Sequence, residues 1–214
     1  MFNKIVMIGV FKNLLSQAKK SYDEFNAADG KIGDGDLGIT ILNGLEEINK
    51  NIDKFNDDLS LNFMLCSQAF VKKSGSSFGT LIAFAFMNIS KDLKNKNSCD
   101  HDDIVNMINI AMETIKERGK TKLGDKTILD SLSFILNNLK TNKKNLNYPE
   151  LFKSSTKDAL NAFKGKNMCD HEDIINMINI AMETIQERGK TKLGDKTILD
   201  SLSFVLNNLK ENKN

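Results

Sequence analysis

Three aspartates and four glycines lie within residues 28–40, whose sequence is ADGKIGDGDLGIT. Carboxylates at Asp29, Asp34 and Asp36 repel one another, so holding them in one turn is unfavourable unless cations lie between them. Carboxylate oxygens suit Mg2+, and the glycines let the backbone bring the three side chains toward one point. We therefore predict a Mg2+ site at these aspartates, which would attract a phosphate through the bound metal.

Two simpler interpretations of this stretch agree less well with its residues. An isolated Asp-Gly-Asp is usually a turn that caps a helix, but the additional Asp29 and the density of glycines favour a metal site. A calcium loop of the EF-hand type, counted from Asp34, would place Gly38 at its fifth position and Leu45 at its twelfth, where oxygen ligands are needed. We therefore exclude a calcium loop of that type.

Length and composition indicate a globular chain without a strong electric field. The chain has 214 residues, 40% of them hydrophobic, and 30 basic against 28 acidic residues give a net charge of +2. Such a balance does not favour nucleic acid as a partner. No apolar run reaches about 18 residues and the start lacks a signal-peptide layout, so we expect neither a membrane span nor export. Three cysteines are too few for a disulfide framework, which favours the cytoplasm.

The hydrophobic pattern is that of an all-α protein. One proline, no tryptophan and little strand-like alternation agree with this fold class. Apolar residues at spacings of three and four predict helices over about residues 3–25, 39–52, 61–71, 81–93, 104–118, 128–139 and 150–163. Cys66 is expected in the core. Residues 100–103 are expected to cap the fifth helix, with His101 in that cap rather than in a metal site, and Asp125 or Thr127 caps the sixth.

Two further loops carry glycines and hydroxyl groups. Residues 72–80, KKSGSSFGT, offer hydroxyls and backbone N–H groups to a phosphate or ribose, although by composition alone a plain linker is equally consistent. Residues 119–127, GKTKLGDKT, begin with the Gly-Lys-Thr of a phosphate-binding P-loop. That motif requires a glycine five residues earlier, where Thr114 stands, and no strand precedes the loop. We therefore exclude a P-loop.

Taken together, three motifs resemble a known family. Residues 32–38, residues 74–80, and Arg118 to Lys120 followed by residues 124–127 are similar, in this order and spacing, to the ADP-binding L subunit of bacterial dihydroxyacetone kinase. The resemblance covers about residues 1–166. It implies a barrel of about eight antiparallel helices that holds ADP or ATP and Mg2+ at one end. It also implies two partners, a subunit with a phosphohistidine that rephosphorylates the ADP and a subunit that holds the dihydroxyacetone.

The resemblance assigns roles to particular residues. Asp29, Asp34 and Asp36 would hold the metals. The expected nucleotide contacts are Leu37, Gly38, Ile39, Thr40, Lys73, Ser74, Gly119, Ile128 and Lys166. The chain departs from the family where it has Leu37 instead of histidine and Lys166 instead of arginine. Lysine lacks the bidentate guanidinium fork of arginine. Lysines also replace the small residues usual at positions 72 and 73, and the Asp-Pro-Gly that closes the family's site near its C-terminus is absent.

The C-terminal part of the chain is a copy of an internal segment. Residues 169–210 repeat residues 99–140, and four pairs differ, namely Asp102/Glu172, Val105/Ile175, Lys116/Gln186 and Ile135/Val205. We predict a binding domain over residues 1–166 and an atypical helical part over residues 167–214. Counting alternating helices places the copied loop, residues 189–197, at the end opposite the aspartates. Two nearly identical segments can compete for one position, so we expect alternative packings or swapped oligomers, including a homodimer.

Three hypotheses about function follow. The first is an ADP- and Mg2+-binding kinase subunit that is active only with partners. The second is a non-catalytic relic or regulatory paralogue, which lacks the segment that closes over the nucleotide. The third is a helical interaction protein whose acidic loop is only a cap, which requires the match of three motifs to be chance. Within the first hypothesis, a triose kinase and a related fatty-acid kinase remain open.

Overall fold

The computed structural model describes residues 1–31, 33–125, 127–142 and 148–163, together with the isolated positions Met182, Leu202, Ser203, Asn207 and Lys210. The chain divides into two compact units, Met1–Ala159 and Leu160–Asn214. The predicted division after residue 166, the copied loop at residues 189–197 and Lys166 itself lie outside the described residues. These three expectations stay predictions.

The secondary structure of the described residues is almost entirely helical, which confirms the all-α prediction. The helices are α1 (Lys4–Lys20), α2 (Tyr22–Asp29), α3 (Leu37–Lys50), α4 (Leu59–Lys73), α5 (Ser77–Asp92), α6 (His101–Gly119), α7 (Ile128–Thr141) and α8 (Tyr148–Phe163), with a short 3-10 helix over Ile52–Lys54. Two short strands, β1 (Phe2–Asn3) and β2 (Ser98–Cys99), pair antiparallel, with Phe2 opposite Cys99 and Asn3 opposite Ser98.

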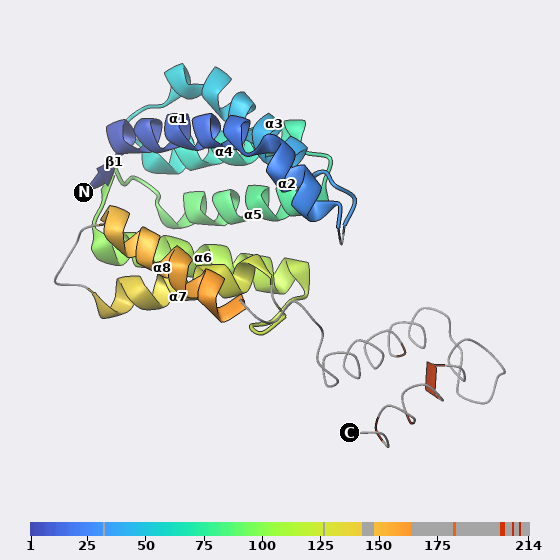
Figure 1. Cartoon of the computed structure of the whole chain (residues 1–214). Helices are drawn as coiled ribbons and strands as arrows, with labels where there is room; N and C mark the ends of the chain where they lie inside the picture. The colour runs from blue at the N-terminus through green and yellow to red at the C-terminus, as the bar shows by residue number, and fades with distance from the viewer. Residues whose placement is uncertain are drawn as a thin grey trace. The chain divides into compact units, whose positions relative to one another are not determined.

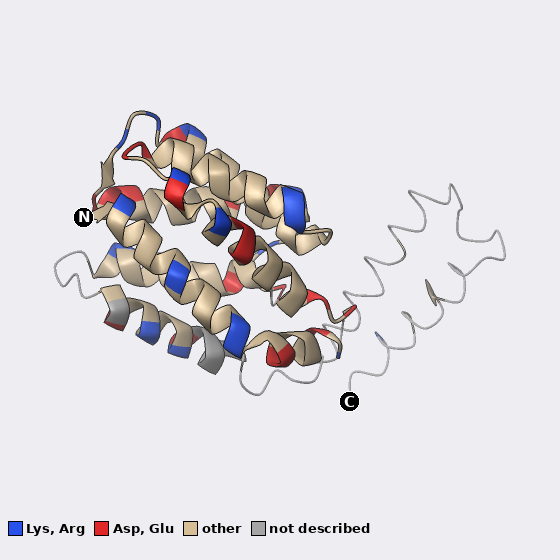
Figure 2. Cartoon of the chain, turned by 90° about the horizontal axis from the view of Figure 1, so that it is seen from above, with Lys and Arg blue, Asp and Glu red and all other residues tan. Residues whose placement is uncertain are grey.

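The helices of the first unit form an antiparallel bundle. In Figure 1, α5 lies between α1 and α4 on one side and α6 to α8 on the other. The succession of antiparallel helices brings the start of α3, the end of α4, the start of α5 and the end of α6 to one end of the bundle. The three glycine-containing loops are therefore at that end. In Figure 2, basic and acidic residues are interspersed along the helices, in agreement with the balanced net charge.

An aromatic cluster fills the core of this bundle. The rings of Phe11, Phe63 and Phe70 each lie about 6 Å from the ring of Phe86, at centroid distances of 6.1, 5.9 and 5.9 Å. Gly44 of α3 admits the Phe70 ring, because a Cβ built at Gly44 would lie 2.4 Å from Phe70 Cε1. Close packing of this kind fixes α3 and α4 against α5, and with them the loops that these helices carry.

The predicted single helix over residues 3–25 is wrong. The structure has two helices there, with Ser21 as the C-cap of α1 and the N-cap of α2. The backbone of Ser21, with φ −99° and ψ 10°, leaves the helical conformation at this point. The buried face of α1 also differs from the expected one, since Met7 is fully buried while Ile5 is 75% exposed. As a result of the break, Asp29 belongs to the last turn of α2 and not to the loop.

Other helix boundaries were partly predicted. α5 begins at Ser77, four residues before the expected start, because the hydroxyl of Ser76 caps it by accepting the Gly79 N–H. Asp100 caps α6 as predicted, and of the two candidate caps of α7 the structure selects Thr127; each forms a capping box with the residue three positions later. 

Cys66 lies in the core as predicted, whereas His101 lies in the first turn of α6 but its ring contacts other helices rather than the cap. His101, the first residue of α6, has Nδ1 3.0 Å from the Tyr148 hydroxyl and Nε2 3.0 Å from the Leu139 carbonyl. It therefore joins α6 to α7 and α8. Cys66 is fully buried, and burial raises the pKa of its thiol; burial also raises the pKa of Cys99 to about 11. In the part of the chain that the structure describes, no helix is both long and apolar enough to span a membrane.

Candidate metal centre

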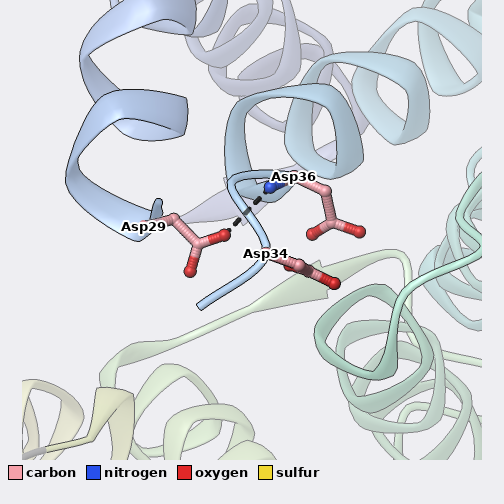
Figure 3. A group of neighbouring side chains, drawn as sticks. All are labelled: Asp29, Asp34 and Asp36. Carbon is pink, nitrogen blue, oxygen red and sulfur yellow. Dashed lines mark hydrogen bonds between the residues drawn. The ribbon is translucent and has the colours of Figure 1, made fainter. Parts of the chain in front are cut away.

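The three aspartates converge at one end of the bundle, as the sequence predicted. One carboxylate oxygen from each of Asp29, Asp34 and Asp36 lies within 4.8 Å of the other two. Figure 3 shows Asp29 at the end of α2 and the other two in the loop that leads into α3. Asp29 and Asp36 are half-buried, and Asp34 is exposed. Three oxygens at this separation can ligate one hard divalent cation or two neighbouring ones.

The last turn of α2 fixes both ends of the acidic loop. Asp29 Oδ2 accepts the N–H of Asp36 at 2.9 Å, drawn as a dashed line in Figure 3, and the Asp29 carbonyl accepts the Gly33 N–H at 2.6 Å. Asn26 Oδ1 accepts the N–H groups of Gly38 at 2.7 Å and Ile39 at 3.2 Å. Hydrogen bonds from Asn26 and Asp29 of α2 to the loop and to the start of α3 thus fix the backbone that carries Asp34 and Asp36.

Two glycines of the loop are required by the backbone. Gly35 has φ +76°, a left-handed conformation that glycine adopts without strain. Gly38 lies against α2, where a Cβ would come within 2.4 Å of the Tyr22 carbonyl oxygen and 2.7 Å of Asn26 Oδ1. α2 and α3 can therefore approach closely enough to bring Asp29 beside Asp36.

The carboxylates of the triad affect one another's protonation. Partial burial, followed by the charges of Asp34 and Asp29, raises the pKa of Asp36 above its usual range, and a hydrogen bond with the Thr40 side chain opposes this rise. The neighbouring negative charges thus favour a proton on Asp36 when no cation is present. A divalent cation would take the place of that proton.

The raised pKa of Asp36 predicts how the stability of the metal-free protein depends on pH. A carboxyl group whose pKa is higher in the folded state stabilises the fold when it is protonated, so its contribution is present at low pH and is lost as the pH rises through the folded-state pKa. We expect the Asp36→Asn variant to lose less unfolding free energy than the parent between about pH 4 and pH 7. Urea denaturation in EDTA measures this difference. Equal pH dependences of the two proteins would contradict it.

The second loop lies directly against the first. Thr40 Oγ1, in the first turn of α3, lies 2.7 Å from Ser76 Oγ, within hydrogen-bond distance, and Ser76 Oγ lies 3.4 Å from Ser74 Oγ. A Cβ on Gly79 would lie 1.5 Å from Ser74 Oγ, so this glycine provides the space for the Ser74 side chain. The hydroxyl groups of Thr40, Ser76 and Ser74 therefore lie between the acidic loop and the start of α5.

Basic groups stand at the end of α4. Lys72 Nζ lies 2.6 Å from Glu47 Oε1, and Glu47 is only 4% exposed. The hydrogen bond from Lys72 lowers the pKa of the Glu47 carboxyl, which stays charged. Lys73, the last residue of α4, is exposed beside Ser74. Lys72 thus has an acidic partner in the bundle, whereas the position of Lys73 suits the predicted contact with a phosphate.

The third loop lies at the same end of the bundle, where the end of α6 packs against α5. Gly119 ends α6, and a Cβ built on it would lie 3.5 Å from Leu81 Cδ1 of α5. The Arg118 guanidinium lies 3.4 Å from the centroid of the Phe84 ring, also in α5. Ile128 is the first residue of α7 and is 37% exposed. Gly119 therefore lies near the first turns of α5, and the expected role of Ile128 against an adenine stays a prediction.

The structure thus brings together most of the predicted site residues. Hydrogen bonds and close approaches link Asp29 and Asp36 with the first turn of α3, Leu37–Thr40, and with Ser74. Sequence reasoning missed Asn26, which accepts the N–H of Gly38, twelve residues later. It also did not assign roles to Ser76 and Gly79. Ser76 and Gly79 lie in the loop that the glycine and hydroxyl pattern had singled out, whereas no local pattern indicated Asn26.

Fold and site together define a helical protein with a three-carboxylate centre at one end, beside hydroxyl groups and helix termini suited to a phosphate ligand. The DAK2 domain matches residues 31–164 and, a second time, residues 157–214. The chain belongs to the DAK2 domain family.

Relatives of known name agree with this family. The chain is 34% identical over 139 residues to the ADP-binding subunit DhaL of PEP-dependent dihydroxyacetone kinase 1 from Listeria innocua, covering 64% of this chain and 69% of that protein. It is 30% identical to the ADP-binding subunit DhaL of kinase 2 from that organism, over 57% of this chain and 58% of that protein. It is 31% identical to the ADP-binding subunit DhaL of the PTS-dependent dihydroxyacetone kinase of Lactococcus lactis, with 64% and 68% covered.

Solved structures confirm the helical fold. The dihydroxyacetone kinase of C. freundii in its native form superposes with a TM-score of 0.60 at 24% identity, over 76% of this chain and 29% of that one. The same enzyme in complex with AMP-PNP and Mg2+ gives a TM-score of 0.59 at 25% identity, over 72% and 27%. The chain therefore spans about a quarter of that longer enzyme, and between 58% and 69% of the three bacterial subunits.

Proposed function

We propose that this chain is the ADP- and Mg2+-binding subunit of a dihydroxyacetone kinase, whose bound nucleotide passes a phosphoryl group to dihydroxyacetone on a partner subunit. The observation that carries the proposal is the convergence of three carboxylate oxygens within 4.8 Å, at the end of a DAK2 fold where the hydroxyl-rich loop also lies. The ADP-binding subunits among its relatives, and the Mg2+ and AMP-PNP in the similar kinase, support it.

In this proposal each loop has a separate task. Asp29, Asp34 and Asp36 would hold Mg2+, which neutralises phosphate charge when bound. Ser74 and Lys73 would contact a phosphate, and the first turn of α3 lies beside them. Gly119 and Ile128 would border the nucleotide. Catalysis would then consist mainly of positioning and charge neutralisation, as expected for phosphoryl transfer.

The proposal also requires partner subunits. His101 is held between α7 and α8 at the start of α6, while Gly119, at the opposite end of that helix, lies near the site. His101 is thus poorly placed to bind a ketone there. We propose that dihydroxyacetone is held by one partner and that a phosphohistidine of another rephosphorylates the ADP. The names of the relatives, which are subunits of PEP- and PTS-dependent kinases, support the need for partner subunits.

One feature of the sequence favours a second candidate function. Residues 169–210 copy residues 99–140, and the family's Asp-Pro-Gly is absent. If this end no longer retains nucleotide, the chain would be a non-catalytic relic or a regulatory paralogue. The two candidates differ in their affinity for ADP.

Calorimetric titration with ADP, with and without Mg2+, tests the proposal. We expect a single binding event that requires Mg2+ and disappears in EDTA. Circular dichroism on the same sample establishes that the protein is folded. A folded protein that binds no ADP at millimolar Mg2+ would refute the kinase-subunit function and favour the relic.

A further inference from the structure

The start of α3 is capped in an unusual way. Asp36 is the N-cap residue of α3, and an aspartate there normally uses its carboxylate to accept an N–H group of the first turn. In this structure the Asp36 side chain makes no cap hydrogen bond. Instead Asn26, from the preceding helix, accepts the N–H groups of Gly38 and Ile39. Asn26, which lies outside α3, thus caps this helix in place of the N-cap residue Asp36.

Capping of α3 by Asn26 affects the metal centre. The N–H groups of Gly38 and Ile39, which an N-cap aspartate would otherwise accept, are already bonded to Asn26. The Asp36 carboxylate can therefore turn toward Asp29 and Asp34. Asparagine is neutral, and it therefore supplies the cap without adding a fourth negative charge to the triad. Gly38, which lacks a Cβ, allows Asn26 to come close enough for this contact.

We propose that Asn26 is a positioning residue of the metal centre, which caps α3 in place of Asp36 and so leaves the Asp36 carboxylate available to the metal. The inference rests on the metal-binding part of the proposed function. Without the Asn26 side chain, Asp36 would turn back to cap α3 and the centre would lose one of its three ligands. Outer hydrogen-bond partners of metal ligands typically change metal affinity by about 10- to 100-fold.

The test uses Mn2+ alone as the probe, with free Mn2+ followed by electron paramagnetic resonance in the full-length protein. We expect Asn26→Ala to weaken Mn2+ binding about tenfold or more. In an Asp36→Asn background the same substitution should weaken binding less than about threefold, because its effect passes through Asp36.

A matched control separates positioning from general destabilisation. Asn62 is fully buried, and its side chain also bonds backbone outside its own helix: it accepts the Asn56 N–H and donates to the Asn56 carbonyl, in the segment before α4. Asn62→Ala should lower the melting temperature and leave Mn2+ affinity unchanged at a temperature where the protein is folded. Loss of Mn2+ affinity in Asn62→Ala equal to that in Asn26→Ala would overturn the inference.

The remaining outcomes are distinct. Parent-like Mn2+ affinity in Asn26→Ala, or an undiminished effect in the Asp36→Asn background, would overturn the role of Asn26. A parent protein that binds Mn2+ but not ADP would refute the proposed kinase function, while the Mn2+ titrations would still decide the role of Asn26. A parent protein that binds neither would refute both.

Discussion

Replacing Asp34 with alanine is expected to lower the affinity for ADP at saturating Mg2+ by about 100-fold or more, because one of three charged metal ligands is lost. Asp34 is the exposed member of the triad, and its contribution is to the centre rather than to the core. Removing one of three like charges reduces repulsion in the metal-free protein. The melting temperature should therefore equal or exceed that of the parent.

Calorimetry with ADP and thermal unfolding in EDTA measure the two effects of Asp34→Ala. Asp53→Ala is the matched control, since Asp53 is also an exposed aspartate but lies in the 3-10 helix that follows α3. This control should bind ADP as the parent does. If Asp34→Ala bound ADP as tightly as the parent, Asp34 would have no part in the centre.

Replacing Gly38 with alanine is expected to lower the free energy of unfolding by about 2–4 kcal/mol, because the new methyl group would meet the Tyr22 carbonyl at 2.4 Å. That oxygen belongs to the backbone of α2, so relief requires a shift of the whole helix. The shift would also separate Asp29 from Asp36 and weaken Mg2+ binding. Urea denaturation measures the loss of stability.

Gly9→Ala provides the matched control for Gly38→Ala. Gly9 lies within α1, and a Cβ there meets nothing within 4 Å. Alanine favours a helix interior over glycine by roughly 0.5–1 kcal/mol, so this variant should be more stable than the parent. A Gly38→Ala protein as stable as Gly9→Ala would mean that α2 and α3 do not need their close contact.

The sequence predicted the helices and the acidic centre because both have local signals. Apolar spacing located α3 to α8, and the density of Asp and Gly singled out residues 28–40 before any fold was known. The break at Ser21 was not predicted, because the apolar spacing continues through it. That break determines the site, since it creates α2 and gives Asp29 its helical position.

The contacts between loops could not be predicted from local patterns. Asn26 bonds residues twelve and thirteen positions later, and Thr40 bonds Ser76, thirty-six positions later. Such pairs depend on how α2 meets α3 and how α3 meets α5, which is a matter of packing. The resemblance to a kinase subunit predicted that the loops converge, and membership of the DAK2 family agrees with it.

The pairing of β1 with β2 has a consequence for the order of folding. Phe2 pairs with Cys99, so this short ribbon closes a loop that contains α1 to α5. Closing so long a loop loses chain entropy, which is recovered only after the enclosed helices have packed. The two strands should therefore pair late, and pulse-labelled amide exchange of the strand residues during refolding would show when the N-terminus joins the folded bundle.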